Sequence, residues 1–407
     1  MKNIKMFARG IAPKLLAVTL LVTLVSGQTA AALETISEYN LPSGAGSPFD
    51  VTTGPDGNLW VLEGGQDKIV KMSPSGTVLA EYGPVSAVSG LLSITNGPDG
   101  NLWFTEYNGT ANKVGKITTA GVITEYSSPT VNSSPYDIVT GPDGNLWFTE
   151  TNGNNIGKIT TAGVITEYPL APGSAPTGIT VGPDGNLWFT EQSTNKISKI
   201  TTAGVITEFS TPTAGSNPND IVTGPDGNLW VTEFSSDTIT KVTTSGVMTE
   251  YPIAAGTNPF NITAGPDGNL WFTGFSSNTV SKLTTAGVVT NFTIPTAASA
   301  PLGITNGPNN QIWFTEQAGS KVGVVSGLNV AAAPTPTPTP TVTAPSSSVT
   351  PTSAVTTPTA PDTGYAAPAS SARVLFTLLP LIPLTALASF YSYRLHRRSP
   401  VAITISK

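Results

Sequence analysis

The chain has 407 residues, a formal net charge of −6 at pH 7, no cysteine and a single histidine, His396. Without cysteine, disulfides are excluded. Residues 33–330 contain ten lysines, no arginine and 24 aspartates and glutamates. No basic patch is therefore available to neutralise phosphates, and we expect no binding to nucleic acid.

The first 32 residues read as a secretory signal peptide. A basic start, Lys2 to Lys14, precedes an apolar run, Leu15 to Val25, that is too short to span a membrane comfortably. Small residues at 30–32 fit cleavage after Ala32. We therefore expect an exported protein.

Residues 33–330 contain a seven-fold repeat whose period runs from 41 to 44 residues. A period near 40 is typical of stacked or radial arrays. Six tryptophans follow the phrase Gly-Pro-Asp-Gly-Asn-Leu, and the seventh follows the variant Gly-Pro-Asn-Asn-Gln-Ile at 307–312. The seven tryptophans are Trp60, Trp103, Trp147, Trp188, Trp230, Trp271 and Trp313.

Each repeat predicts four short strands. In one repeat the β-rich runs are 137–140, 146–150, 156–160 and 164–168, and turn-forming residues separate them. No helical period appears. A four-stranded unit of this length, repeated seven times, predicts an all-β fold: a seven-bladed β-propeller of four-stranded blades.

The two ends of the array predict that the ring closes. The seventh repeat stops after its third run, at 321–325, and the missing fourth strand appears before the first repeat as Thr35-Ile36-Ser37-Glu38-Tyr39. We expect this N-terminal strand to complete the last blade, which would remove the exposed sheet edges.

The chain after the propeller predicts a stalk and an anchor. Residues 331–360 are rich in Pro and Thr without charge, which favours a disordered, polyproline-like stalk. Residues 374–393 carry no charge and have the length of one transmembrane helix. The basic residues behind it, at 394–398, place the C-terminus inside and the propeller outside.

The segment 361–407 resembles the sorting signal of sortase-anchored bacterial surface proteins, Leu-Pro-x-Thr-Gly followed by an apolar span and a basic tail. Pro361, Asp362, Thr363 and Gly364 fit this pattern, whereas Ala360 stands in place of Leu. The resemblance implies cleavage after Thr363 by sortase and attachment to the cell wall. A plain single-span membrane anchor is the alternative.

The propeller repeats are similar to those of the virginiamycin B lyase family, seven-bladed propellers that linearise streptogramin antibiotics. The phrases Gly-Pro-Asp-Gly-x-Leu-Trp-Phe-Thr-Glu and Gly-x-Ile-Thr-Glu-Tyr carry the likeness over residues 34–326. It implies two catalytic histidines, a Mg²⁺ ion and a nearby glutamate. Phe260 and Leu302 stand at the histidine positions, Glu316 matches the glutamate near the metal, and Ala300 replaces a second family glutamate.

We expect the ligand face of the propeller where the innermost strands begin. The candidate residues precede each repeat glycine by four or five positions, and they are Phe49, Asp50, Tyr136, Asp137, Asp220, Phe260 and Leu302. The second strands end in Glu63, Glu106, Glu150, Glu191, Glu233, Gly274 and Glu316, which predicts a ring of carboxylates on the same face. The alternative is that this glutamate is a consensus residue that pairs with a lysine or satisfies loop amides.

These patterns leave two functions open. The first is a non-catalytic, monomeric surface propeller that binds a glycan, a peptide or a protein. The second is a metal-dependent lyase or hydrolase with an altered active site. With His396 behind the predicted span, no histidine is left in the propeller for proton transfer, so we expect no lyase activity. Convergent carboxylates favour Mg²⁺ or Ca²⁺ as cofactor candidates, with Glu316 as a metal ligand.

Overall fold

The computed structural model describes residues 33–329 except 43, 45, 87 and 109. The chain divides into two units, Met1–Pro336 and Thr337–Lys407, and every described residue lies in the first. Within the described residues, no helix is both long and apolar enough to cross a bilayer. The predicted signal peptide, stalk, sorting signal and span at 374–393 lie outside the described residues.

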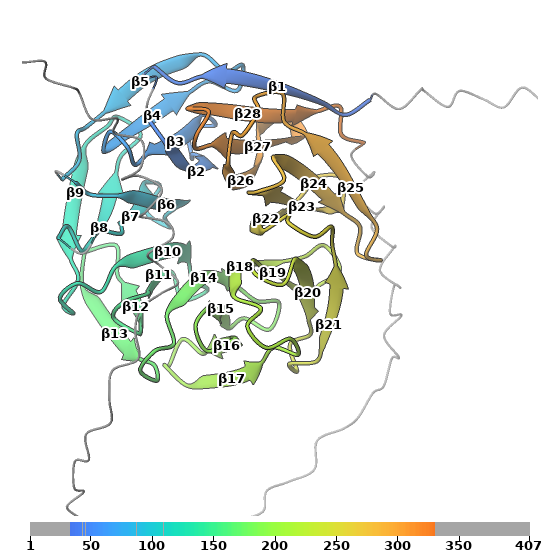
Figure 1. The fold of residues 1–407 in the computed structure, drawn as a ribbon. Coiled ribbons are helices and arrows are strands. Elements are labelled where there is room, and N and C mark those ends of the chain that lie inside the picture. Colours follow the sequence, from blue (N-terminus) through green and yellow to red (C-terminus); the bar gives the residue numbers. More distant parts are fainter. Residues whose placement is uncertain (1–32, 43, 45, 87, 109, 330–407) are drawn as a thin grey trace, which may run out of the picture. The chain divides into compact units, whose positions relative to one another are not determined.

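Seven four-stranded antiparallel sheets form the fold, one for each repeat (Figure 1). We number them as blades 1 to 7. Blade 1 contains β2 (Pro48–Thr53), β3 (Leu59–Glu63), β4 (Lys68–Met72) and β5 (Val78–Tyr82). Blade 2 contains β6 (Leu91–Asn96), β7 (Leu102–Glu106), β8 (Lys113–Ile117) and β9 (Ile123–Ser127). Blade 3 contains β10 (Pro135–Thr140), β11 (Leu146–Glu150), β12 (Asn155–Ile159) and β13 (Ile165–Pro169).

The later blades repeat this order. Blade 4 contains β14 (Pro176–Val181), β15 (Leu187–Glu191), β16 (Lys196–Ile200) and β17 (Ile206–Ser210). Blade 5 contains β18 (Pro218–Thr223), β19 (Leu229–Glu233), β20 (Thr238–Val242) and β21 (Met248–Pro252). Blade 6 contains β22 (Pro259–Ala264), β23 (Leu270–Gly274), β24 (Thr279–Leu283) and β25 (Val289–Thr293). Blade 7 contains β26 (Pro301–Gly307), β27 (Gln311–Glu316), β28 (Lys321–Ser326) and β1 (Thr35–Asn40), with the 3₁₀ helix η1 (Pro308–Asn310) between β26 and β27.

The N-terminal strand closes the ring, as predicted. β1 pairs antiparallel with β28 from Thr35 opposite Ser326 to Asn40 opposite Lys321. Figure 1 shows β1 and β28 side by side, with the first and last described residues meeting in the same blade. The closing strand leaves blade 7 with the same four strands as every other blade.

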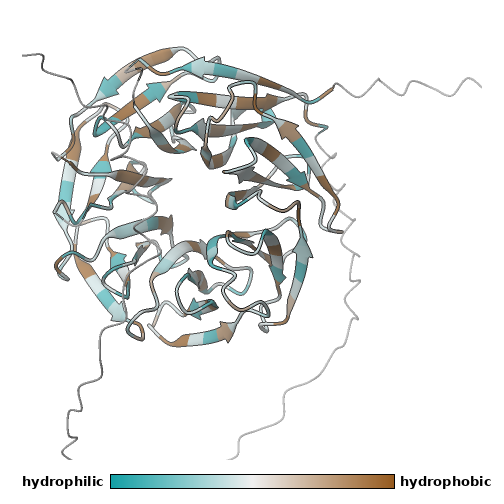
Figure 2. Cartoon of the chain, in the orientation of Figure 1, coloured by the Kyte–Doolittle hydropathy of each residue, from teal (hydrophilic) through white to brown (hydrophobic). Residues whose placement is uncertain are grey.

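The core of the propeller lies between neighbouring blades. The second strand is buried along its whole length in blades 1 to 6 and from Ile312 onwards in blade 7, whereas the residues of the fourth strands are exposed or half-buried. Trp103 of blade 2, for example, packs with Ile138, Leu146 and Phe148 of blade 3. Figure 2 accordingly shows hydrophobic positions within the strands and hydrophilic loops around them.

A polar and aromatic stack ties the Gly-Pro-Asp-Gly-Asn turn to its blade. In blade 1, Trp60 Nε1 donates a 3.1 Å hydrogen bond to Asp56 Oδ1, and Lys71 forms a 2.7 Å ion pair with Asp56 Oδ2. The Lys71 ammonium lies 5.2 Å from the Trp60 ring centroid, and Tyr82 stacks on Trp60 at 5.5 Å. The repeated aspartate is therefore explained by the tryptophan that it orients.

Blade 7 departs from this arrangement. Asn309 replaces the aspartate and Val324 replaces the lysine. The Trp313 Nε1 atom is buried without a hydrogen-bond partner, although Trp313 still stacks on Tyr39 of the closing strand at 5.6 Å. Blade 7 therefore relies on β1 more than on its own turn.

Candidate functional site

A β-bulge at the start of each innermost strand positions the side chains at the centre of the ring. In blade 3, Pro135 pairs with Glu150 and Ile138 pairs with Phe148, so Tyr136 and Asp137 together face a single residue of β11. The same register shift occurs in all seven blades. A bulge bends its strand and turns the extra side chain in a new direction, here towards the central cavity.

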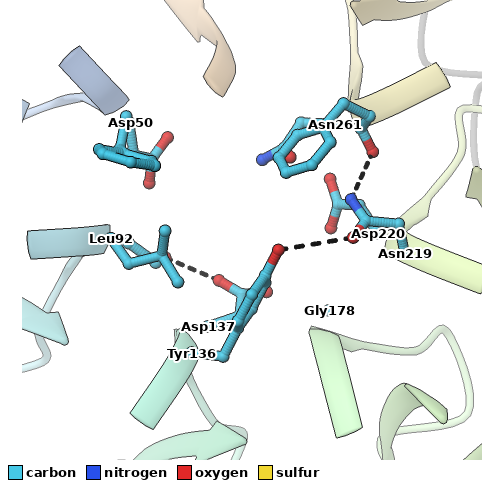
Figure 3. Close-up of a pocket in the computed structure, with 11 residues that line it drawn as sticks. Asp50, Leu92, Tyr136, Asp137, Gly178, Asn219, Asp220 and Asn261 are labelled. Atoms are coloured by element: carbon cyan, nitrogen blue, oxygen red, sulfur yellow. Dashed lines mark hydrogen bonds between the residues drawn. The ribbon is translucent and has the colours of Figure 1, made fainter. Parts of the chain in front are cut away.

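These bulges surround a small cavity of about 30 Å³ that is partly open to solvent. Figure 3 shows its side chains converging from separate blades. Six of the seven ligand-face candidates line it, whereas Leu302 is only 1 % exposed and does not. The lining residues are Phe49, Asp50, Leu92, Ser93, Tyr136, Asp137, Gly178, Asn219, Asp220, Phe260 and Asn261.

Three aspartates from alternate blades connect the innermost strands in pairs. In Asp50, Asp137 and Asp220, Oδ1 accepts the amide of the next residue and Oδ2 accepts an isoleucine amide of the following blade, all at 2.8–2.9 Å. Asp137 Oδ1 also accepts a 2.7 Å hydrogen bond from Ser93 Oγ. The carboxylates thus fasten blade 1 to blade 2, blade 3 to blade 4, and blade 5 to blade 6.

The same aspartates carry strongly perturbed pKa values. Burial raises the pKa of Asp50 to about 7, against the hydrogen bonds from the Ile94 and Val51 amides, and the charge of Asp137 raises it further. Burial also raises the pKa of Asp137, and burial together with the charge of Asp137 raises that of Asp220. Of the described residues that line the cavity, none is a lysine or an arginine. The three carboxylates therefore lack a cationic neighbour.

Two aromatic clusters include the cavity-lining rings of Tyr136 and Phe260. Tyr107 lies edge-on to Tyr136 at 5.7 Å on blades 2 and 3. On blades 5 and 6, Phe260 packs edge-on to Phe234 at 6.2 Å and tilted against Phe275 at 6.3 Å. The Tyr136 hydroxyl reaches across towards Asn219 of blade 5, with 3.5 Å between the oxygens (Figure 3).

Tyr107, Phe234 and Phe275 were not predicted from the repeat pattern. Each of them directly follows the last residue of a second strand, a position that holds Gly64, Thr151, Gln192 and Gln317 in other blades. Variation at a position next to an otherwise regular phrase was the signal that could have found them. The same kind of variation had identified Phe49, Tyr136 and Phe260.

The predicted ring of glutamates at the mouth is wrong. Glu63, Glu106, Glu150, Glu191, Glu233 and Glu316 are all 0 % exposed and lie inside their blades. The lysine next to this position pairs instead with the glutamate of the fourth strand, as Lys113 does with Glu125 at 2.6 Å. Hydroxyl groups donate hydrogen bonds to several of the buried glutamates. Ser198 and Thr194, for example, donate to Glu191. These glutamates are therefore better described by the alternative interpretation, a repeated structural residue, except that hydroxyl groups and not lysines are their partners.

Glu316 does not stand in a metal centre of the ordinary kind. Both carboxylate oxygens are buried without a hydrogen-bond partner, and the same is true of Glu106 in blade 2, so this state is not peculiar to Glu316. Burial raises the pKa of Glu316 to about 8, with the charge of Glu38 adding and Lys321 opposing. Among residues 33–329 that the structure describes, no cluster of three or more His, Cys, Asp or Glu side chains could hold a metal ion. The described residues therefore supply no set of ligands for a resident Mg²⁺ at Glu316.

Comparison with known proteins agrees with this geometry. The family model described as the virginiamycin B lyase family matches residues 34–175 and 170–344, which is most of the chain. The chain belongs to the virginiamycin B lyase family. No curated protein sequence matches it.

Solved structures of virginiamycin B lyases match the propeller as a whole. A streptogramin B lyase is 35% identical with a TM-score of 0.69, over 72% of this chain and 97% of the other. Virginiamycin B lyase from Staphylococcus aureus is 38% identical with a TM-score of 0.68, over 72% of this chain and 99% of the other. A catalytically inactive histidine-to-alanine variant of that lyase, with quinupristin, is also 38% identical, with a TM-score of 0.69 and the same coverage.

Proposed function

We propose that this protein is an exported propeller, anchored at the cell surface, that binds its ligand in the central cavity without converting it. One observation carries the proposal. The two positions at which the sequence resemblance places the family's histidines hold Phe260 and Leu302, and the single histidine of the chain, His396, lies outside the propeller. Phe260 lines the cavity, and Leu302 is buried beside it at the start of β26.

Neither a phenylalanine nor a leucine can transfer a proton, and removal of a positioned general base typically lowers a rate by a factor of ~10²–10⁴. The histidine-to-alanine variant from Staphylococcus aureus is described as catalytically inactive, and its structure is with quinupristin. Loss of a histidine in that relative is thus compatible with a ligand in place. For the present chain, this supports binding without turnover.

The test is incubation of the purified full chain with a streptogramin B and Mg²⁺, followed by mass spectrometry. We expect no linear product above a control without protein. The double variant Phe260→His with Leu302→His is the positive arm, in which a trace of activity is expected. Ring opening by the wild-type protein would overturn the proposal.

The cavity suits a glycan, a peptide or a protein as ligand, because aromatic rings and hydrogen-bonding groups lie together at its mouth. An array of glycans, peptidoglycan fragments and peptides, with and without Mg²⁺ or Ca²⁺, tests retention directly. Retention without change of the ligand is the expected result.

One observation favours an enzyme as the second candidate. Asp50 lies at the cavity with a pKa raised to about 7 by burial, the range in which a carboxylate works as a general base near neutral pH. Both of its oxygens already accept backbone amides, which favours a structural role. Turnover of any compound retained on the array, abolished by Asp50→Asn in a folded protein, would favour the enzyme.

The proposed location rests on sequence alone. Pro361, Thr363 and Gly364 match the sorting pattern, with the apolar segment 374–393 and the basic residues 394–398 behind them. Sortase and the cell wall are accordingly the proposed partners of the C-terminal segment, and a single-span membrane anchor is the alternative.

A further inference from the structure

The central cavity combines two features that the proposed function does not itself require. Its walls are aromatic, with Phe49, Tyr136 and Phe260 contributed by different blades. Its polar lining is acidic, because Asp50, Asp137 and Asp220 lie in it. Burial, and after it the charge of Asp137, raises the pKa of both Asp50 and Asp220. An aromatic cavity of this kind accepts apolar groups, and the aspartates add a preference for positive charge.

The aspartates are explained only in part by their structural role. Their hydrogen bonds to backbone amides hold the bulged strands together, but amides bring no net positive charge. Buried charges in proteins are normally paired, bound to a metal, or neutralised through a shifted pKa. No lysine or arginine is among the described residues that line the cavity, so no cation of the lining compensates these carboxyl groups. The cavity therefore lacks a positive charge that a ligand could supply.

The chemistry of the lining selects an organic cation over a metal ion. Hard metal ions take six to eight convergent oxygen ligands, and the described part of the chain contains no cluster of three acidic or histidine ligands. Aromatic rings, in contrast, bind ammonium and guanidinium groups through their faces, and their carbon atoms pack against an alkyl stem. The net negative charge of residues 33–330 attracts such a group towards the mouth.

We propose that the cavity takes a primary ammonium group carried on an alkyl stem, as on a lysine side chain, with the stem between the aromatic walls and the ammonium near Asp50, Asp137 and Asp220. This deepens the proposed function, on which it rests, by naming the ligand group that enters the mouth. The weak contact between Tyr136 of blade 3 and Asn219 of blade 5 crosses the cavity lining, and the incoming stem replaces it.

Binding of matched probes to the purified full chain tests the charge preference. Nα-acetyl-lysine methylamide and Nα-acetyl-norleucine methylamide have similar stems, and only the first carries an ammonium group. We expect the lysine probe to bind at least about tenfold more tightly at pH 8.5, as cation–π and carboxylate contacts predict. Equal affinity of the two probes, or no saturable binding of the lysine probe, would overturn the proposal. A third probe, n-butylammonium, separates a free amine from a peptide side chain.

The pH dependence gives a second readout. Asp137, Asp220 and Tyr136 are the titratable groups that face Asp50 across the cavity, and none is positively charged. Because the pKa of Asp50 is raised to about 7, its carboxylate forms above that pH. The lysine probe should therefore bind more weakly at pH 5.5 than at pH 8.5, whereas the norleucine probe should not change.

A matched pair of variants tests the missing charge without any ligand. Asn261 lines the cavity, so Asn261→Lys places a tethered ammonium there, and Asn261→Met provides a side chain of similar length without charge. We expect the lysine variant to unfold at a higher temperature than the methionine variant, with a larger difference at pH 8.5 than at pH 5.5. A lower midpoint for the lysine variant at pH 8.5 would contradict the proposal. If the lysine probe fails while the array still retains another ligand unchanged, this inference falls and the proposed function stands.

Discussion

At the scale of single residues, one hydrogen bond marks the difference between blade 7 and the others. Tryptophan Nε1 donates to the turn aspartate in six blades at 3.0–3.1 Å. Asn309 and Asn310 in blade 7 both adopt positive φ, 60° and 55°, and the turn no longer presents an acceptor to Trp313. A buried donor without a partner destabilises a fold by roughly 1–3 kcal/mol.

Restoring the consensus turn should therefore stabilise the protein. We expect Asn309→Asp with Asn310→Gly to raise the free energy of unfolding by about 1 kcal/mol, or the midpoint by about 2 °C. Thermal denaturation monitored by Trp fluorescence measures the effect. Asn310→Gly alone is the control and should give little of the gain. No difference between the double variant and this control would mean that Trp313 has another partner.

The site residues show what a sequence discloses at this scale. Phe49, Asp50, Tyr136, Asp137, Asp220 and Phe260 were predicted from their position four or five residues before each repeat glycine, and the bulge brings them together. The depth of the repeated glutamates was not predictable, because a strand-ending glutamate looks the same whether it meets solvent or a hydroxyl. That hydroxyl comes from different positions: Ser198 of β16 donates to Glu191 in blade 4, whereas Ser128, which directly follows β9, donates to Glu150 in blade 3.

At the scale of elements, β1 is the strand on which the ring depends. Besides its ladder with β28, Glu38 accepts hydrogen bonds from Lys321 and from the backbone and side chain of Thr296. Glu34 forms an ion pair with Lys282 of blade 6. The sequence predicted this closure because the missing strand of the last repeat was visible at the start of the array.

Deletion of residues 33–40 should open blade 7. The change exposes the edge of β28 and removes Tyr39 from Trp313, so we expect a strongly lowered unfolding midpoint and aggregation. Differential scanning calorimetry and light scattering measure both effects. Glu34→Gln, which removes only the ion pair with Lys282, is the control and should cost less than about 1 kcal/mol. An unchanged midpoint in the deletion variant would exclude β1 from the ring.

At the scale of the whole molecule, the buried carboxyl groups and the turn aspartates make the stability of the fold depend on pH in opposite directions. Burial raises the pKa of Asp50 and Glu106 to about 7 and that of Glu316 to about 8. These groups bind protons in the folded state that the unfolded chain has released, so their contribution to stability falls as the pH rises from about 4 to 8. The pKa of Asp56, despite partial burial, is lowered to about 2 by Lys71 and Trp60, so its contribution is lost as the pH falls below about 4.

The midpoint of thermal unfolding should therefore be highest near pH 4–5 and decrease towards pH 8. Scans from pH 3 to pH 9 measure this profile. Glu106→Gln removes one buried titratable carboxyl group. The unfolding midpoint of this variant should therefore decrease less between pH 5 and pH 8 than the midpoint of the wild type. A wild-type midpoint that rises between pH 5 and pH 8 would show that these carboxyl groups are not buried as described.

Anchoring is tested on the complete chain in cells. Thr363→Ala should prevent covalent attachment to the wall, because the proposed cleavage follows Thr363, and should leave the protein extractable by detergent. Fractionation of cells with an antibody to the propeller measures this, with Ser347→Ala in the predicted stalk as the control. Wild-type protein that is fully extractable by detergent would favour the single-span anchor instead.

The register of β1 on β28 also has a mechanical consequence. A pull on the chain beyond Asn329 enters the propeller through β28, which is held on both sides, by β27 and by six paired residues of β1. Tension on β28 must break its hydrogen bonds to β1 and to β27 at the same time. If β28 were the outermost strand of blade 7, the same tension would have to break only one set of hydrogen bonds. The N-terminal strand β1 therefore clamps the C-terminal strand β28, and a propeller pulled at its C-terminal end would resist unfolding.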